Sequence, residues 1–188
     1  MQITLVIHTF NDTRGGKEIF TWNLVRRLLD RGVQFHVVAS DYKEMSHPGI
    51  EFHDVPMVGK ALGIHRWVFS RLARRIVREL DSDLVFTDDK TGYGDVIRIG
   101  GLPLEPHVNI LRNQVESGFP RLWYSLRQWL SLSKTVSRYM ERKTFTGASF
   151  SRVIAASRYL RDHLLRAYPD LTEEDITVLY NGYDPDQY

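Results

Sequence analysis

"ITLVIHTFNDTRGGKEIFTWNLVRRLLDRGVQFHVVA", residues 3–39, decides the fold of this chain. Residues 3–7 are a short apolar run, partly β-branched, which is typical of a strand buried on both faces of a parallel sheet. From Glu18 to Arg31, apolar residues recur every third or fourth position and form the stripe of an amphipathic helix, which Gly32 ends. A second buried strand follows at Phe35–Ala39. Strand, glycine loop, helix and strand in this order are the βαβ unit of an open α/β sheet.

The alternation continues along the rest of the chain. Further strands are expected at residues 50–55, 83–86, 96–99, 108–111, 152–155 and 176–179. Helices are expected at 67–80, at 120–146 as one long helix or a broken pair, and at 157–168 with Ser157 as the N-cap. This pattern predicts an α/β fold, a Rossmann-like, doubly wound and mostly parallel sheet with helices on both faces.

The amino-acid composition excludes several classes of protein. The chain has 188 residues, of which 43% are hydrophobic and 26% charged, and this suits one domain with its own core. Without cysteine, disulfides and zinc–thiolate sites are excluded, and we predict no metal site and no cofactor. No apolar run approaches the roughly 18 residues of a spanning helix, and the start MQITLVI lacks the features of a signal peptide. A cytoplasmic protein is therefore expected.

The adjacent glycines Gly15 and Gly16 lie between the first strand and the first helix, where an open α/β sheet binds ligands. The loop lacks both the G-x-G-x-x-G pattern of dinucleotide sites and the G-x-x-x-x-G-K-[ST] pattern of P-loops. Two interpretations stay open. The glycines either permit a tight turn with positive φ, or let the backbone approach an anion or a sugar.

Five stretches resemble, in order and spacing, the N-terminal half of family 4 retaining glycosyltransferases of the GT-B fold: GGKE (15–18), LLDRGVQFHVV (28–38), MERKTF (140–145), VIAASRYLRDHL (153–164) and ITVLYNGYD (176–184). Within that family, the likeness is greatest to bacterial enzymes that glycosylate the core of lipopolysaccharide. The resemblance implies that residues 1–180 are the acceptor-side Rossmann-like domain and that 181–188 begin an interdomain linker. It also implies a nucleotide-sugar donor, bound mainly by a C-terminal domain outside this chain, so the chain alone should be inactive.

The same resemblance suggests site residues. It places Gly15, Gly16 and Lys17 against the donor phosphates or the transferred sugar. In "YGDVIRIGGLPLEPH" (93–107), it assigns Asp95 and His107 to the reacting centre and Arg98 to substrate binding. This stretch departs from the family pattern, because Gly100-Gly101 stands where an acidic residue is expected. An acceptor-orienting carboxylate is therefore missing from the turn.

Other polar residues follow predicted strand ends. Asn113 and Glu116 could hydrogen-bond sugar hydroxyls, although a solvated loop is an equal alternative. His8, together with the loop residues Thr9, Asn11 and Thr13, is expected to face the cleft. The pair Asp88-Asp89 follows the strand at 83–86, and we favour helix capping over ligand binding for it.

Two helical segments are strongly basic. Residues 66–78 contain five arginines and no acid, and residues 119–143 contain six Lys or Arg against one Glu, with interspersed aromatics. Such helices suit the headgroup region of an anionic membrane. We predict membrane contact by Arg121, Trp123, Arg127, Trp129 and Lys134, with inward packing of the Trp and Leu residues as the alternative. Nucleic acid is not expected as a partner, because the net charge is only +2 and no nucleic-acid-binding motif is present.

The functional hypothesis is thus the acceptor-binding domain of a retaining glycosyltransferase. The enzyme would move a sugar from a nucleotide-sugar to a lipid-linked saccharide such as lipopolysaccharide core, at the inner face of the cell membrane. One alternative is a non-catalytic α/β module that binds a glycan or an anionic membrane surface. Another is an ordinary nucleotide-binding Rossmann domain, which affinity of this chain alone for a nucleotide would favour.

Overall fold

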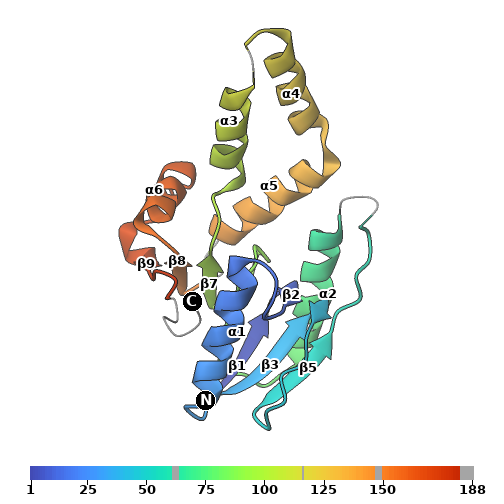
Figure 1. The fold of residues 1–188 in the computed structure, drawn as a ribbon, viewed down its shortest axis with the longest axis vertical. Helices are drawn as coiled ribbons and strands as arrows, with labels where there is room; N and C mark the ends of the chain where they lie inside the picture. Colours follow the sequence, from blue (N-terminus) through green and yellow to red (C-terminus); the bar gives the residue numbers. More distant parts are fainter. Residues whose placement is uncertain (61–63, 116, 147–149, 183–188) are drawn as a thin grey trace.

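The computed structural model describes residues 1–60, 64–115, 117–146 and 150–182 (Figure 1). Within these ranges, seven parallel strands form one sheet in the order β5-β3-β1-β6-β7-β8-β9. The strands are β1 (Gln2–Val6), β3 (Gln34–Ala39), β5 (Ile50–Asp54), β6 (Leu84–Thr87), β7 (Val96–Ile99), β8 (Arg152–Ala155) and β9 (Ile176–Val178). A short parallel pair, β2 (Thr9–Phe10) and β4 (Asp41–Tyr42), extends from one end of the sheet.

The helices of the described residues are α1 (Gly16–Leu29), α2 (His65–Glu79), α3 (Leu104–Gln114), α4 (Phe119–Leu130), α5 (Leu132–Phe145) and α6 (Arg158–Ala167), with a 3-10 turn η1 (Glu173–Asp175). Ser157 caps α6 as predicted, since its Oγ accepts a hydrogen bond from the Leu160 backbone N–H at 3.2 Å. Gly32 follows α1 with a φ of +81°, the conformation that favours glycine after a helix. The predicted α/β fold is confirmed.

Residue alternation explains the two faces of the sheet. In β1, Leu5 packs with Val25 and Leu29 of α1, whereas the next residue, Val6, packs with Phe69 and Ala73 of α2. Side chains of successive strand residues point to opposite faces, so a strand covered on both sides must be apolar throughout. A third cluster joins β7, β8 and β9 to α6.

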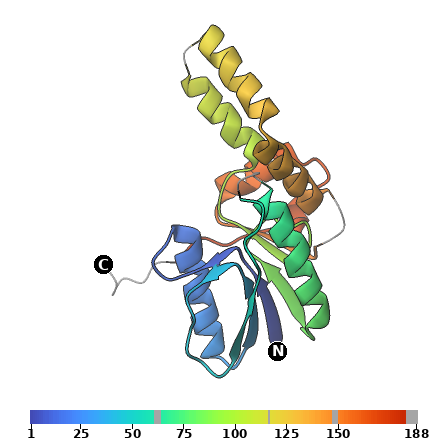
Figure 2. The same cartoon turned by 90° about the vertical axis from the view of Figure 1, so that its right-hand side faces the viewer.

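Helices α3, α4 and α5 form an arm that projects from the sheet (Figures 1 and 2). The predicted long segment is a broken pair, because α4 ends before Ser131 and the Ser131 Oγ accepts from the Lys134 N–H to begin α5. The strand predicted at 108–111 is wrong, since these residues lie inside α3. The short stretch VNIL, with three apolar residues and one asparagine, fits a strand and a helix equally well, and here only Val108 of the four is buried.

The sheet order reverses between β1 and β6. Connections from β1 lead outward to β3 and β5, and the later strands continue from β6 on the other side. In doubly wound sheets a crevice opens at such a point, at the carboxyl ends of the strands. The polar residues that follow β1, β6 and β7 therefore converge on one place.

Candidate functional site

A cleft of about 530 Å³ lies at the carboxyl ends of β1, β6 and β7. Its walls come from both halves of the sheet and from the helices next to it. The first turns of α1 and α2 form one side, and the start of α3 and one face of α5 form the other. Charged or titratable side chains dominate the lining: His8, Lys17, Glu18, His65, Arg66, Asp88, Asp89, Lys90, Arg98, His107, Lys134 and Glu141.

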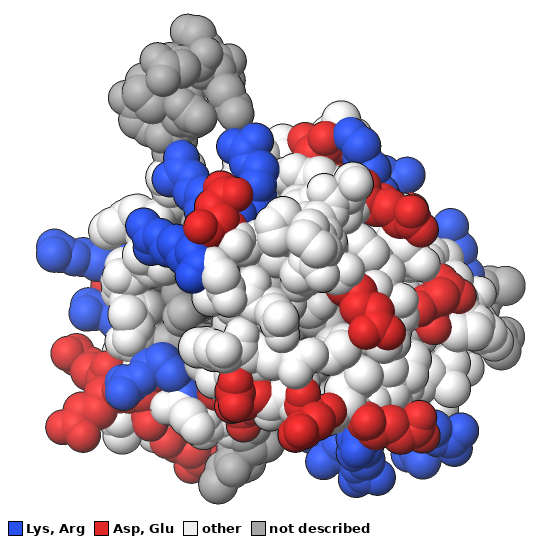
Figure 3. Space-filling model, turned by 90° about the horizontal axis from the view of Figure 1, so that it is seen from below, with Lys and Arg blue, Asp and Glu red and all other residues white. Residues whose placement is uncertain are grey.

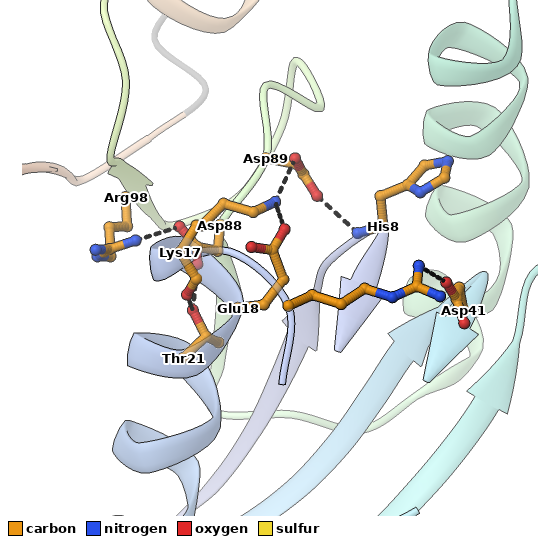
Figure 4. Close-up of polar contacts among 9 residues, drawn as sticks. His8, Lys17, Glu18, Thr21, Asp41, Asp88, Asp89 and Arg98 are labelled. Carbon is orange, nitrogen blue, oxygen red and sulfur yellow. Dashed lines mark hydrogen bonds and ion pairs between the residues drawn. The ribbon is translucent and has the colours of Figure 1, made fainter. Parts of the chain in front are cut away.

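A buried ion pair forms the floor of the cleft (Figure 4). Arg98 Nη1 donates to Asp88 Oδ1 at 2.9 Å, and the exposed fractions of the two side chains are 1% and 0%. The Thr21 hydroxyl donates to the other Asp88 oxygen, while Arg98 Nη2 donates to Asn181 at 2.7 Å. Burial raises the pKa of Asp88 to about 6, although the cations Arg98 and Lys17 act to lower it. This pair ties α1, β6, β7 and the chain after β9 together.

Asp89 organises the glycine-loop side (Figure 4). Its carboxylate accepts from the His8 backbone N–H at 2.6 Å and from Lys17 Nζ at 3.0 Å. Glu18 lies 3.7 Å from the same ammonium group. Burial acts to lower the pKa of Lys17, but the carboxylates of Asp89 and Asp88 outweigh it and raise that pKa. Lys17 is therefore a fixed cation at neutral pH.

Asp88 and Asp89 correct the sequence analysis, which favoured helix capping. Neither carboxylate accepts a hydrogen bond from a backbone N–H in the first turn of a helix in the described ranges. They instead hold Arg98 and Lys17 in the cleft. Their place directly after a buried central strand was the available signal, because carboxyl strand ends collect site residues in this fold.

The geometry of the glycine loop decides between its two interpretations. Gly15, the N-cap of α1, has a φ of −28°, and neither it nor Gly16 is among the described glycines with positive φ. The two glycines are therefore not required for a tight turn with positive φ. A Cβ on Gly16 would have no heavy atom within 4 Å, so no packing constraint of this chain requires a glycine there. Both glycines are exposed beside Lys17, which lines the cleft. Close approach by a ligand remains the prediction.

On the opposite wall, Glu141 of α5 is a buried carboxylate that the sequence analysis did not single out. It pairs with Lys90 and accepts the Leu104 backbone N–H at 2.8 Å, which places it at the N-terminus of α3. A carboxylate at this end of a helix satisfies a free N–H group and interacts well with the helix dipole. Glu141 thereby fixes α3, and with it the predicted site residue His107, beside the cleft.

The structure brings only part of the predicted site together. Arg98, His107 and Lys17 line the cleft, and so do Gly100 and Gly101. Asp95 does not: it lies at the amino end of β7, where its carboxylate accepts the Val85 N–H at 2.7 Å. Its assignment to the reacting centre is therefore wrong.

Three further predictions need separate placement. Asn113 is exposed near the end of α3 and is not at a strand end, because the predicted strand before it is helical. Glu116 lies outside the described residues. Lys134 lines the cleft, and its contact with a membrane stays a prediction.

Two histidines add unsatisfied polar atoms to the cleft. His8 Nε2 and His65 Nδ1 are buried and have no hydrogen-bond partner among the described residues. Their rings meet edge to face, with centroids 5.7 Å apart. Burial lowers the pKa of each ring, and so both are neutral at neutral pH. Neutral imidazoles can donate to or accept from uncharged hydroxyl groups.

The outer helix of the arm, α4, carries an exposed apolar stripe. Phe119, Leu122, Trp123, Leu126 and Leu130 recur at helical spacing, and Trp123 is 58% exposed. The alternative that these side chains pack inward is thus contradicted for Leu122 and Trp123. The side chain of Trp129 lies outside the part that the structure describes. Arg127 shares a hollow of about 360 Å³ with Trp123. Arg121 donates to the Val115 carbonyl at 3.1 Å. In the described ranges, no helix is both long and apolar enough to cross a bilayer.

Comparison with known proteins gives a family and a fold. The family model described as Glycosyltransferase Family 4 matches residues 14–187. No curated protein matches the chain. The crystal structure of WaaG, a glycosyltransferase involved in lipopolysaccharide biosynthesis, superimposes with a TM-score of 0.80 at 17% identity, over 98% of this chain and 46% of that one. Sucrose-phosphate synthase from Thermosynechococcus elongatus gives 0.63 at 14% identity, over 97% and 48%. The chain thus spans about half the length of each.

Proposed function

Because the chain belongs to glycosyltransferase family 4, we propose that it is the acceptor-binding half of a retaining enzyme of GT-B fold. That enzyme transfers a sugar from a nucleotide-sugar to a lipid-linked saccharide, such as lipopolysaccharide core, at the inner face of the cell membrane. The structural likeness to WaaG, a glycosyltransferase involved in lipopolysaccharide biosynthesis, agrees with this acceptor class. The chain by itself binds acceptor and does not catalyse transfer.

The polar groups of the cleft suit a sugar that carries anionic groups. His8 and His65 offer neutral ring nitrogens to hydroxyl groups. Arg66 of α2 and Lys134 of α5 add positive charge to the cleft, and neither makes an ion pair within the described part of the chain. The other cations, such as Arg98, are already matched by carboxylates. A phosphorylated or acidic saccharide would supply the missing partners.

In retaining transfer, positive charge develops on the sugar while the donor phosphate leaves. Positioning and electrostatic stabilisation then contribute more than a single base. We assign positioning roles to this half of the enzyme. Lys17, beside the exposed Gly15-Gly16 loop, faces the donor phosphates, and His107 holds the acceptor side above the buried pair of Arg98 and Asp88. The carboxylates nearest the loop, Asp89 and Glu18, keep Lys17 in place.

One observation carries the membrane part of the proposal: the exposed apolar stripe of α4 is joined directly to α5, whose other residues line the cleft. A lipid-linked acceptor held at a membrane by α4 would find the cleft at the base of the same arm, whose projection from the sheet Figure 2 shows. The opposite end of the molecule, seen in Figure 3, intersperses acidic with basic side chains. Charge and exposed apolar surface therefore both favour docking through the arm.

The test is co-sedimentation of the chain with vesicles, either anionic or neutral, over a salt series. We expect salt-sensitive binding to the anionic vesicles. Trp123→Ala should weaken it, whereas Tyr159→Ala, a similarly exposed aromatic on α6, should not. Arg127→Gln should lower partitioning about fivefold, since one charge near an anionic surface is worth about 1 kcal/mol. Arg31→Gln, at an exposed position just after the end of α1, is the matched control.

Equal binding by all four variants, or no binding to either vesicle, would remove the membrane role and leave a soluble acceptor. A separate titration with nucleotide-sugar addresses the function itself. Tight nucleotide binding by this chain alone would contradict the acceptor role and favour a nucleotide-binding Rossmann domain.

A further inference from the structure

A cluster of metal-binding side chains lies away from the cleft, on two neighbouring strands. His36 belongs to β3, and Glu51 and His53 belong to the edge strand β5. The parallel register pairs His36 with Glu51 and Val38 with His53, which brings the three side chains to one face of the sheet. One ligand atom of each residue lies within 4.8 Å of the others. Nothing in the proposed glycosyl transfer uses these residues.

The separations match the needs of one small cation. His36 Nδ1 lies 3.0 Å from His53 Nε2 and 3.4 Å from a Glu51 oxygen, and His53 Nε2 lies 3.8 Å from the other Glu51 oxygen. In a tetrahedral zinc site with bonds of about 2.0–2.1 Å, ligand atoms are about 3.3 Å apart. The three groups thus need to move by only a few tenths of an ångström. Two imidazoles and one carboxylate leave the fourth position for water.

A second contact orients the first imidazole. The Gln2 side-chain amide lies 2.5 Å from His36 Nε2, the ring nitrogen that points away from the cluster. A half-turn of this amide exchanges its oxygen and nitrogen, and the oxygen then accepts the Nε2 proton. That tautomer leaves Nδ1 free for a metal. Histidine ligands in metal sites commonly donate their other N–H in this way.

We propose that His36, Glu51 and His53 bind a divalent transition-metal ion of the zinc type, which joins the edge strand β5 to β3. Nitrogen and carboxylate ligands favour zinc, cobalt or nickel over the all-oxygen sites of magnesium and calcium. His36 is nearly buried, whereas the Glu51 side chain is 66% exposed, so the site is open to solvent on one side. The ion would act on stability at the sheet edge.

The experiment uses the full chain without a histidine tag, stripped by a chelator and then titrated with Co²⁺ and, separately, Zn²⁺. We expect one Co²⁺ per chain with the intense visible absorption of tetrahedral cobalt, and a higher thermal unfolding midpoint with Zn²⁺. His53→Gln should lower the affinity at least about 100-fold, and Gln2→Ala about 10–100-fold. His163→Gln, on α6, should leave affinity unchanged.

Glu51→Gln provides a variant that is certain to leave the core intact, because that side chain is exposed. It should weaken Co²⁺ binding and change the absorption spectrum. The proposal is overturned if the wild-type chain takes up no stoichiometric Co²⁺, or if Glu51→Gln and His53→Gln bind as tightly as His163→Gln does. Neither result would bear on vesicle or acceptor binding.

Discussion

Arg98→Met tests the buried ion pair under the cleft. The substitution keeps most of the side-chain volume but removes the charge that faces Asp88, the hydrogen bond to Asn181 and the contact with the Phe20 ring, 3.8 Å from the guanidinium. Both partners are almost wholly buried. Removing one partner of such a pair leaves an uncompensated buried charge and costs about 3–5 kcal/mol. We expect this loss in the free energy of unfolding at about pH 8.

The same prediction has a defined pH dependence. Burial raises the pKa of Asp88 to about 6 in the native state, and Arg98 acts to lower it, so removing Arg98 raises this pKa further. Above about pH 7, one unit above that pKa, Asp88 in the wild-type protein is ionised in both the folded and the unfolded states. In the variant, Asp88 still binds its proton more tightly in the folded than in the unfolded state. Above this pH, only the variant therefore loses stability as the pH rises. At about pH 5 both native states hold the proton, and the difference should shrink to about 1–2 kcal/mol.

Urea unfolding followed by tryptophan fluorescence measures these differences as changes in midpoint at constant m-value. The control is Arg14→Met, which breaks the exposed pair between Arg14 and Asp41, with side chains 60% and 35% exposed. It should cost about 0–1 kcal/mol at either pH. The reasoning is refuted if Arg98→Met costs no more than the control, or if its cost is the same at about pH 5 and about pH 8.

Three further predictions concern glycines at the two ends of α1 and a histidine of the cleft. Gly16→Ala should leave the free energy of unfolding unchanged or raise it by up to about 1 kcal/mol, because the added Cβ meets open space and alanine favours helix. Gly32→Ala should instead cost about 1–2 kcal/mol, because Gly32 has a φ of +81°. The urea unfolding midpoints of the two variants measure this difference. In a two-domain enzyme, Gly16→Trp should reduce transfer far more than stability, and equal losses would contradict ligand approach. Burial lowers the pKa of His8, so the unfolded chain binds the proton more tightly than the folded chain does. The wild type should therefore lose stability relative to His8→Asn as the pH falls below about 6.5. The same pH dependence of the free energy of unfolding in both proteins would contradict this.

The periodicity of apolar residues in the sequence was sufficient to predict most of the strands and helices. The apolar runs of β1 and β3 and the stripe of α1 are local patterns, and each has one stable solution in a doubly wound sheet. The stretch at 108–111 was assigned wrongly because a segment of only four residues is too short to show a periodicity of its own. The helices around it, α4 and α5, were expected, but that α4 stands away from the body with its apolar face exposed was not decided by the pattern.

The candidate site was predictable in part. The Gly15-Gly16 loop, Lys17, Arg98 and His107 follow from position and from the family resemblance, and the last three line the cleft. Asp95 was assigned to the site because it is close to Arg98 in the sequence. The four-residue strand β7 begins directly after Asp95, however, so Asp95 lies at the amino end of the sheet and the cleft at the carboxyl end. Other pairings link positions far apart in the chain: Glu141 with Lys90, and Arg98 with Asn181.

The sequence by itself therefore determined which segments are strands and helices, and that their carboxyl ends form a site, because those properties depend on residues a few positions apart. Only the tertiary structure decided which charges meet: Asp88 with Arg98, Asp89 with Lys17, and His36 with Glu51 and His53. Such meetings depend on strand order and register, in which a shift of one residue turns every side chain to the other face of the sheet.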